Sequence, residues 1–274
     1  MKVLLFGRTG QVATEIRRLA GPDLAVTALG RAEADLTDPA ACAAAVAGAD
    51  AQAVINAAAY NAVDRAEEEE ALAHVVNAEA PGAMARAAAA RGLPFLHVSS
   101  DYVFDGGGER PWREGDPVGP LSAYGRTKLA GERAVEAAGG VHAILRTAWV
   151  FAGHGGNFAA TMLRVGRGRE RLEVIDDRRG GPTPAGAIAA ALVAMAQGLV
   201  EDASPEKTGI FHFAGAPAVT WCGFACEIFA RTGWDRVPEV APITSADWPA
   251  PAARPQHAVL DCSRIRRAWG IGQP

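Results

Sequence analysis

Apolar runs alternate with amphipathic helical patterns along the first half of the chain. Residues 3–6 form an apolar run that ends at Gly7. In the segment that follows, Val12, Ile16 and Leu19 fall on one helical face. This order indicates a strand, a turn and a helix. The same alternation predicts strands at 24–29, 53–55, 95–98 and 143–145 and helices at 40–47, 81–90 and 123–137.

The predicted strands are apolar without regular polar alternation. Strands buried on both faces are typical of a parallel sheet that helices cover on both sides. We therefore predict an α/β fold, a Rossmann-type doubly wound parallel sheet with a smaller C-terminal α/β domain for the substrate. Glycine and proline interrupt the chain after about residue 150. We expect the Rossmann domain in residues 1–150 and the smaller domain in residues 151–274, part of which returns to the Rossmann domain.

The charge of the chain argues against a nucleic-acid partner. The net charge is -4, 21% of the residues are charged, and no basic block could neutralise a row of phosphates. The first apolar run is too short for a signal peptide, and no run of about 18 apolar residues occurs elsewhere. We expect a cytoplasmic location and no membrane partner. The 4 cysteines form no paired CxxC motif, which favours small buried thiols over a metal site.

A glycine motif stands between the first predicted strand and the first predicted helix. Gly7 allows a tight turn, Gly10 lets the backbone approach a pyrophosphate, and Ala13 is small enough for the helix to lie against the strand. Amides at the helix start would hold phosphate oxygens. The spacing is GxxGxxA, so an ordinary glycine turn stays open as the alternative. The candidate cofactor-binding residues here are Gly7, Arg8, Thr9, Gly10, Gln11 and Val12.

The end of the second predicted strand indicates which dinucleotide binds. A carboxylate there binds the 2'-hydroxyl of NAD and repels the 2'-phosphate of NADP. This strand ends in Leu29, Gly30 and Arg31, with no acid. Arg31 and Arg8 favour NADP(H), because a guanidinium pairs with phosphate, and NAD(H) is the alternative if both arginines are solvated surface residues. Asp35 and Leu36 would lie near the adenine, and Ala57, Ala58 and Ala59 beside the phosphates and ribose.

Tyr124 and Lys128 are four residues apart and share one face of the helix predicted at 123–137. A lysine ammonium near a phenol favours the phenolate and can also bind the nicotinamide ribose. Ser100 follows the strand predicted at 95–98, where its hydroxyl can bond a substrate carbonyl oxygen. Together these three residues predict a hydride-transfer site. The spacing alone would equally suit a structural pair on a helix surface.

Longer motifs make the chain similar to one family. It resembles the dTDP-4-dehydrorhamnose reductase family of the extended short-chain dehydrogenase/reductase superfamily, over nearly its whole length. The motifs that carry this resemblance are LFGRTGQ at 5–11, NAAAY at 56–60, AVDRAE at 62–67, SSDYVFDG at 99–106, YGRTKLAGE at 124–132, RTAWVF at 146–151 and RP at 254–255.

The resemblance implies a role for several residues. Tyr124 would donate the proton, Lys128 would assist it and bind the ribose, and Ser100 would replace the hydroxyl that the family usually supplies as threonine. The implied reaction reduces the 4-keto group of dTDP-4-dehydro-6-deoxy-L-mannose with NADPH and gives dTDP-L-rhamnose. The implied substrate-binding residues are Asn61, Ser100, Asp101, Tyr102 and Trp149, and Tyr60 joins the cofactor-binding set.

Other interpretations stay open on the sequence. Asn61 replaces the usual threonine, so the chain could reduce a different 4-keto-deoxy sugar nucleotide. A non-catalytic NADP-binding regulatory subunit, similar to the beta subunit of methionine adenosyltransferase, is the alternative from another class. Some family members bridge a dimer with Mg²⁺ held by glutamates, and Glu15 matches one such position, but no complete metal site can be placed. We expect a monomer or a homodimer without a metal.

Overall fold

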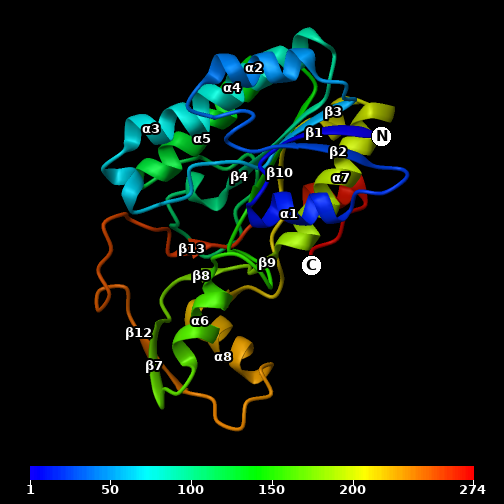
Figure 1. Cartoon of the computed structure of the whole chain (residues 1–274). Helices are drawn as coiled ribbons and strands as arrows, with labels where there is room; N and C mark the ends of the chain where they lie inside the picture. Colours follow the sequence, from blue (N-terminus) through cyan, green and yellow to red (C-terminus); the bar gives the residue numbers. More distant parts are fainter.

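The computed structural model describes all residues, 1–274. Its centre is a six-stranded sheet in the order β10-β5-β4-β3-β1-β2, in which every neighbouring pair is parallel (Figure 1). The predicted Rossmann-type α/β fold is confirmed. The strands of this sheet are β1 (Lys2–Phe6), β2 (Ala25–Leu29), β3 (Ala53–Asn56), β4 (Phe95–Ser100), β5 (His142–Thr147) and β10 (Gly209–His212).

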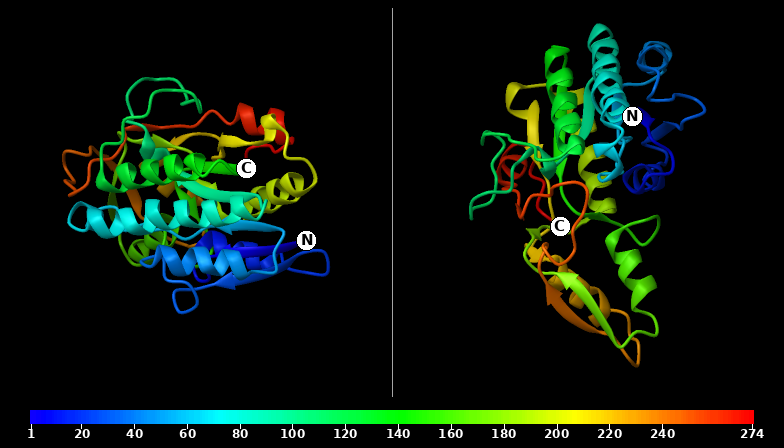
Figure 2. Two further views of the ribbon diagram at one scale, coloured as in Figure 1. Left: turned by 90° about the horizontal axis from the view of Figure 1, so that it is seen from above. Right: turned by 90° about the vertical axis from the view of Figure 1, so that its left-hand side faces the viewer.

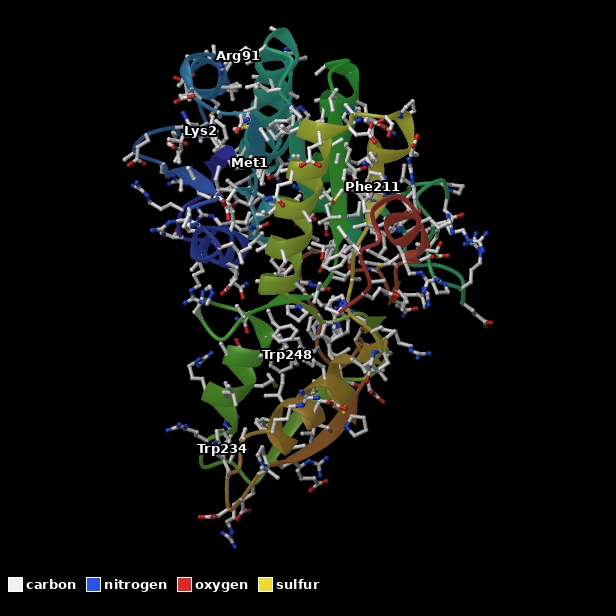
Figure 3. The ribbon with its side chains drawn as sticks, turned by 90° about the vertical axis from the view of Figure 1, so that its right-hand side faces the viewer. Met1, Lys2, Arg91, Phe211, Trp234 and Trp248 are labelled. Atoms are coloured by element: carbon white, nitrogen blue, oxygen red, sulfur yellow. The ribbon has the colours of Figure 1, made fainter.

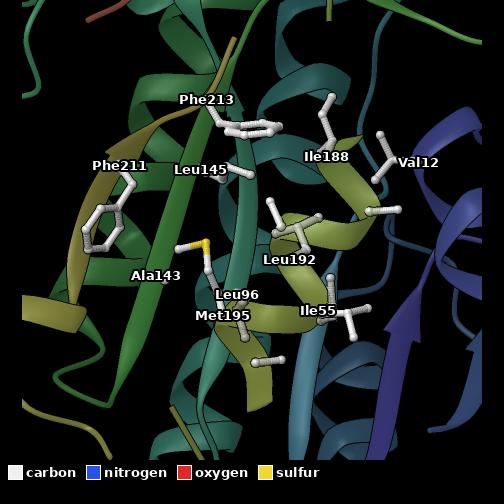
Figure 4. Close-up of a cluster of buried hydrophobic side chains, with 14 of the residues drawn as sticks. Val12, Ile55, Leu96, Ala143, Leu145, Ile188, Leu192, Met195, Phe211 and Phe213 are labelled. Atoms are coloured by element: carbon white, nitrogen blue, oxygen red, sulfur yellow. The ribbon is translucent and has the colours of Figure 1, made fainter. Parts of the chain in front are cut away.

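Successive residues of the strands enter two separate cores, one on each face of the sheet. On β1, Val3 and Leu5 belong to one core, whereas Leu4 and Phe6 belong to the other. This separation follows from the two-residue period of a strand. Helices cover both faces: α2, α4 and α5 pack on one and α1 and α7 on the other (Figure 1). The larger core places Ile188, Leu192 and Met195 of α7 against the strands (Figure 4).

The helices begin at residues that suit a helix N-terminus. Asp38, Ser122, Asn157 and Thr220 each accept a hydrogen bond from a backbone N–H of the following first turn. The α-helices are α1 (Gln11–Arg18), α2 (Pro39–Gly48), α3 (Glu70–His74), α4 (Ala80–Ala90), α5 (Ala123–Ala137), α6 (Phe158–Gly166), α7 (Ala185–Glu201), α8 (Trp221–Ala230) and α9 (Ser263–Trp269). One π-helical turn, η2 (Val75–Glu79), joins α3 to α4, and the 3₁₀ turns are η1 (Arg65–Glu67), η3 (Asp101–Val103) and η4 (Pro205–Lys207).

A smaller lobe extends from the carboxyl end of the sheet, and the molecule is elongated (Figures 1 and 2). It contains α6, α8 and three small sheets, ordered β11-β8-β13, β12-β7 and β6-β9. The chain then returns to the large lobe, since β10 pairs with β5 and α7 packs on the sheet. The short strands are β6 (Val150–Phe151), β7 (Arg171–Ile175), β8 (Arg179–Gly180), β9 (Thr183–Pro184), β11 (Val219–Thr220), β12 (Glu239–Ile243) and β13 (His257–Ala258).

Two sequence expectations differ from the structure. β4 and β5 continue two residues beyond the predicted ends, through Ser99, Ser100, Arg146 and Thr147. Backbone pairing, which does not depend on side-chain polarity, extends the ladder there. The cysteines were expected to be small buried thiols, but Cys226 is exposed on α8; all four are free. None of the helices combines the length and apolar character needed to cross a bilayer.

Candidate active site

The strand order reverses at β1, which has β2 on one side and β3 on the other. In an open parallel sheet, ligands bind at the carboxyl ends of the strands at such a point. A cavity of about 510 Å³ lies there. Its lining includes most of the predicted cofactor residues: Gly7, Arg8, Thr9, Gly10, Arg31, Asp35, Leu36, Ala57, Ala58 and Ala59.

The glycine turn fits a dinucleotide. Gly7 has φ +111°, a conformation that side chains rarely adopt, and a Cβ added there would come within 3.2 Å of Ala13 Cβ. Gly10 is the N-cap residue of α1, and a Cβ at Gly10 would meet no atom within 4 Å. Gly10 lines the cavity and leaves room there, so a pyrophosphate could approach the N-terminus of α1.

The second strand ends differently from the sequence prediction. We expected no acid there, but Glu33 folds back onto the end of β2, where it accepts a hydrogen bond from Gly30 N (2.9 Å) and pairs with Arg8 (2.6 Å). These partners lower the pKa of the Glu33 carboxyl, with the Gly30 amide as the largest cause. Arg31 is exposed, with Nε 3.9 Å from Asp35. Residues 29–31 carry no acid, but the turn after β2 brings Glu33 back to the end of the strand.

Several predicted residues lie beside the cavities without lining them. The side chain of Gln11 accepts a hydrogen bond from Asn157 Nδ2 (2.9 Å), Val12 is buried in the core, and the Tyr60 hydroxyl donates to Glu69 (2.6 Å). Asn61, predicted to face the substrate, lines the dinucleotide cavity instead of the larger one.

Tyr124 lies on the first turn of α5 and is buried. Its ring packs edge-on against Tyr102, with 5.3 Å between the centroids. Burial raises the pKa of the Tyr124 hydroxyl well above its ordinary value, and the neighbouring Ser100 side chain opposes this shift. The structure thus brings together the predicted proton donor and the strand-end serine. A phenol with this pKa keeps its proton at neutral pH.

Asp101 follows Ser100 and is equally enclosed. The Ser100 hydroxyl donates to Asp101 Oδ1 (2.8 Å), whereas Oδ2 is buried without a hydrogen-bond partner. Burial raises the pKa of Asp101 to about 7, although the bond from Ser100 lowers it. A buried acceptor without a partner is costly unless a ligand or a proton satisfies it. Asp101 is therefore suited to meet a hydroxyl of a bound ligand.

Lys128 is buried one helical turn after Tyr124. Its Nζ donates to the carbonyl of Val98 (2.7 Å) and lies 3.5 Å from His97 Nε2. Burial lowers the pKa of the lysine to about 8, against the opposing effect of Glu132. Burial, Ser100, Asp101 and Tyr102 shift the pKa of Tyr124. Lys128, which we expected to favour the phenolate, is not one of these causes.

A larger cavity of about 810 Å³ opens toward the smaller lobe. Asp101, Tyr102 and Trp149, three of the predicted substrate residues, line it. Trp149 stacks on Trp221 with ring centroids 3.5 Å apart, and its φ of +46° is rare outside glycine. Trp248 also lines this cavity although it is 65% exposed; Figure 3 labels it near the junction of the lobes.

Two arginines give this larger cavity a positive wall. Arg254 pairs with Asp64 (2.7 Å), and Arg178 has a buried Nε without a hydrogen-bond partner. Burial lowers the pKa of the Arg178 guanidinium, and the charge of Arg254 lowers it further. Like charges held together without a full set of partners are typical of an anion site. An anionic ligand would offset the two like charges and accept from Arg178, whereas Arg254 already pairs with Asp64.

The glutamate considered for a metal has other partners. Glu15 Oε1 lies 2.6 Å from His154 Nε2 and 2.7 Å from Arg18. These contacts lower the pKa of Glu15, with His154 as the largest cause. The structure holds no group of three or more His, Cys, Asp or Glu side chains placed to bind a metal ion.

Sequence reasoning missed Arg178, Trp221 and His97. Arg178 and Trp221 belong to the less regular half of the chain, where no hydrophobic period marks them. His97 stands within an apolar strand and has no metal or nucleophile spacing. Only Arg254 had a sequence signal, as part of the RP motif at 254–255, and no role was assigned to it.

Comparison with known proteins gives full-length matches. The family model described as "RmlD substrate binding domain" matches residues 1–274. The dTDP-4-dehydrorhamnose reductase of Burkholderia thailandensis is 42% identical, covering 100% of this chain and 95% of that protein. A crystal structure of a dTDP-4-dehydrorhamnose reductase from Clostridium acetobutylicum has a TM-score of 0.89 at 36% identity, covering 97% and 92% of the two chains. The Bacillus anthracis dTDP-4-dehydrorhamnose reductase, solved in complex with NADP, has a TM-score of 0.91 at 28% identity, covering 99% and 94%.

Proposed function

The chain belongs to the family of the dTDP-4-dehydrorhamnose reductases, and we propose that it reduces the 4-keto group of dTDP-4-dehydro-6-deoxy-L-mannose with NADPH to give dTDP-L-rhamnose. The family resemblance found in the sequence motifs is thereby confirmed. The observation that supports the proposed reaction best is the buried pair of Tyr124 and Ser100. Tyr124 packs against Tyr102, which lines the larger cavity, and Ser100 ends a strand of the sheet whose carboxyl edge carries the dinucleotide cavity.

NADPH supplies the hydride for the substrate carbonyl carbon. Tyr124 holds a proton at its hydroxyl and delivers it to the carbonyl oxygen as negative charge develops there. The Ser100 hydroxyl, which donates to Asp101 Oδ1 in the free protein, turns to donate a hydrogen bond to the same oxygen, which stabilises the transition state more than the ground state. Lys128 in its ammonium form would bind the nicotinamide ribose and return a proton to Tyr124 after the transfer, and a proton from water would then restore the ammonium.

The larger cavity holds the nucleotide sugar in this proposal. Asp101 accepts a hydrogen bond from a sugar hydroxyl through Oδ2, the buried atom that has no partner in the protein. Arg178 and Arg254 bind the diphosphate, whose charge offsets their mutual repulsion. Trp149, stacked on Trp221, forms an apolar wall beside them.

The end of β2 supports NADP(H) with NAD(H) as a second cofactor. Arg8 and Arg31 line the dinucleotide cavity and can pair with a 2'-phosphate. Glu33 lies at the same place and can accept from a 2'-hydroxyl. The site therefore has arginines for the 2'-phosphate of NADPH and a carboxylate for the 2'-hydroxyl of NADH. Because the two arginines outnumber the carboxylate, we expect NADPH to bind more tightly than NADH.

The test is NADPH oxidation with a panel of sugar nucleotides. Purified protein is given dTDP-4-dehydro-L-rhamnose, which is another name for dTDP-4-dehydro-6-deoxy-L-mannose. The matching UDP sugar and other 4-keto-6-deoxy dTDP sugars are tested beside it, each with NADPH and with NADH. The proposal expects the highest kcat/KM for dTDP-4-dehydro-L-rhamnose with NADPH. Preference for another sugar would keep the chemistry and overturn the substrate. Tight NADPH binding without turnover on any sugar would favour the regulatory-subunit alternative, which binding to a methionine adenosyltransferase would then support.

A further inference from the structure

A chain of buried polar groups leads from β3 to the lysine of the candidate site. Asn56 and His97 are both fully buried and are register partners on the adjacent strands β3 and β4. Asn56 Oδ1 accepts a hydrogen bond from the backbone N–H of Ala58 (3.1 Å), and Asn56 Nδ2 lies 3.2 Å from His97 Nδ1. The imidazole thus has an amide on one side and Lys128 Nζ on the other.

The Ala58 amide determines the orientation of the Asn56 side chain. With Oδ1 toward Ala58 N–H, the NH₂ group of Asn56 faces His97 Nδ1, and the reverse orientation would set two donors against each other. Since an amide NH₂ only donates, His97 Nδ1 must accept. The proton of the neutral imidazole is then on Nε2, the nitrogen 3.5 Å from Lys128 Nζ.

An N–H that points at an amine has a chemical consequence. A charged ammonium has only donors, so it cannot accept this hydrogen, whereas a neutral amine can. The carbonyl of Val98, 2.7 Å from Nζ, accepts a hydrogen bond from the lysine in either state. Strand β4 therefore presents one acceptor, the Val98 carbonyl, and one donor, the His97 Nε2–H, to Lys128 Nζ. This pair of groups suits a neutral amine better than an ammonium.

Other charges around Lys128 do not reverse this preference. Glu132, one turn further along α5, favours the ammonium, but its carboxylate is already paired with Arg146 of β5 in a buried bidentate contact (2.7 and 2.8 Å). Tyr124 on α5 is a neutral phenol, and Asp101 stands next to Ser100 and Tyr124. The imidazole of His97 stays neutral, because burial and then Lys128 keep its pKa well below the ordinary value.

We infer that Asn56 and His97 are positioning residues that fix the Nε2–H tautomer and present this N–H to Lys128, so that the lysine of the proposed reductase exchanges its proton readily instead of remaining a permanent cation. This inference rests on the proposed function for its catalytic meaning. Its structural part, the tautomer of His97, stands on the hydrogen-bond chain alone. The lowered pKa of Lys128 agrees with it.

The tautomer can be read without any turnover. The full-length protein, labelled with ¹⁵N in its 6 histidines and saturated with NADP⁺, is examined by two-bond ¹⁵N–¹H correlation between pH 5.5 and 9. His97 is assigned from the signal lost in His97→Gln. A neutral ring protonated at Nε2 throughout this range supports the inference. A ring protonated at Nδ1, or an imidazolium, overturns it.

The effect on Lys128 is tested by reversing the tautomer. In Asn56→Asp the carboxylate still accepts from Ala58 N–H but now also accepts from His97 Nδ1–H, which leaves a lone pair on Nε2 toward the lysine. The ammonium gains a partner, so the alkaline limb of the kcat profile should move upward by about one pH unit. Absence of a shift in a variant that still binds NADPH overturns the inference.

The double variant Asn56→Asp/His97→Gln separates the tautomer from plain charge. Without the imidazole, a shift that passes through His97 disappears, whereas a direct effect of the new carboxylate on Lys128 persists. Loss of the shift supports the inference, and an equal shift in the single and double variants overturns it. Failure of the wild-type protein to reduce any sugar nucleotide would refute the proposed function instead, and the NMR result would still decide the tautomer.

Discussion

Two carboxyl groups near the candidate site have opposite surroundings. Asp101 is enclosed, with one oxygen unpartnered, and burial raises its pKa to about 7. Glu33 is open to solvent, and its hydrogen bonds with Gly30 and Arg8 lower its pKa. Near neutral pH, Asp101 can therefore exist with or without its proton and accepts a ligand hydroxyl only when it is ionised, whereas Glu33 is always an acceptor.

Replacement of Asp101 should change how stability depends on pH. The folded protein holds the Asp101 proton up to about pH 7, whereas the unfolded chain loses it near pH 4. Folded molecules thus carry the extra proton in this window, so the contribution of Asp101 to the free energy of unfolding falls as pH rises from about 4 to 7. Asp101→Asn removes this loss. Urea unfolding at pH 5 and pH 8 should show the variant gaining on the wild type at the higher pH; a difference that is the same at both values would contradict the account.

Replacement of Glu33 should alter the choice of cofactor. Glu33→Gln keeps an acceptor for Gly30 N–H but removes the negative charge from the cavity that Arg8 and Arg31 line. We expect KM for NADPH to fall several-fold relative to KM for NADH, because repulsion of the 2'-phosphate is lost. Asp50→Asn, which changes the net charge equally at an exposed pair with Lys2, is the matched control. Equal ratios in both variants would mean that Glu33 does not face the ribose.

Helix α5 carries the proposed catalytic side chains along one side. Tyr124, Lys128 and Glu132 follow one another at intervals of four residues, and all three are buried. The close packing needs a glycine between them: a Cβ on Gly125 would lie 2.3 Å from the carbonyl oxygen of Tyr102. The helix and the turn after β4 therefore touch through backbone atoms, which fixes Tyr124 relative to Ser100.

A methyl group at this contact should displace the helix. We expect Gly125→Ala to lower the free energy of unfolding by roughly 1–3 kcal/mol, the usual cost of overpacking, and to lower kcat as Tyr124 moves from Ser100. The control is Gly48→Ala at the end of α2, where a Cβ would meet nothing within 4 Å and alanine should be neutral or slightly stabilising. Thermal unfolding and turnover of both variants check this. Wild-type stability and kcat in Gly125→Ala would show that the backbone can move away from the added methyl group without disturbing the site.

The sequence predicted elements better than contacts between them. The helix at 123–137 and the motif GxxGxxA are local patterns, and the structure has α5 at those residues and Gly7 in the positive-φ turn. The fold-back of Glu33 onto Gly30 depends on the path of a turn, which hydrophobic periodicity does not describe. The contact between His97 and Asn56 could not be predicted for a different reason. It depends on the register between β3 and β4, which the sequence of each strand alone does not give.

The larger cavity combines residues from distant parts of the chain. Asp64 and Asp101 come from the first half, and Arg178 and Arg254 from two irregular segments of the second. These loops meet only in the folded protein, so the positive wall could not be predicted from spacing. We also propose the division into a Rossmann domain and a substrate domain on this basis, with α7 and β10 returning to the sheet.

Loss of one of these arginines should weaken the binding of the nucleotide sugar and leave the binding of NADPH unchanged. Because a charge-assisted hydrogen bond contributes about 1.5–3 kcal/mol, we expect Arg178→Met to raise KM for dTDP-4-dehydro-L-rhamnose by roughly 10- to 100-fold and to leave KM for NADPH unchanged. Arg179→Met alters the next residue, which is exposed and does not line the cavity, and serves as the control. A rise in both Michaelis constants would point to a structural role for Arg178.

The most direct test of the proposed reaction follows the transferred atoms. Wild-type protein and Tyr124→Phe are incubated with dTDP-4-dehydro-L-rhamnose and NADPH that carries deuterium at the transferring position, and the product is examined by NMR. We expect deuterium at C4 of dTDP-L-rhamnose from the wild type, and a rate lower by about 10²- to 10⁴-fold from Tyr124→Phe with NADPH binding intact. Wild-type protein that binds NADPH yet transfers no deuterium to C4, or Tyr124→Phe that transfers it at the wild-type rate, would refute the proposed reaction.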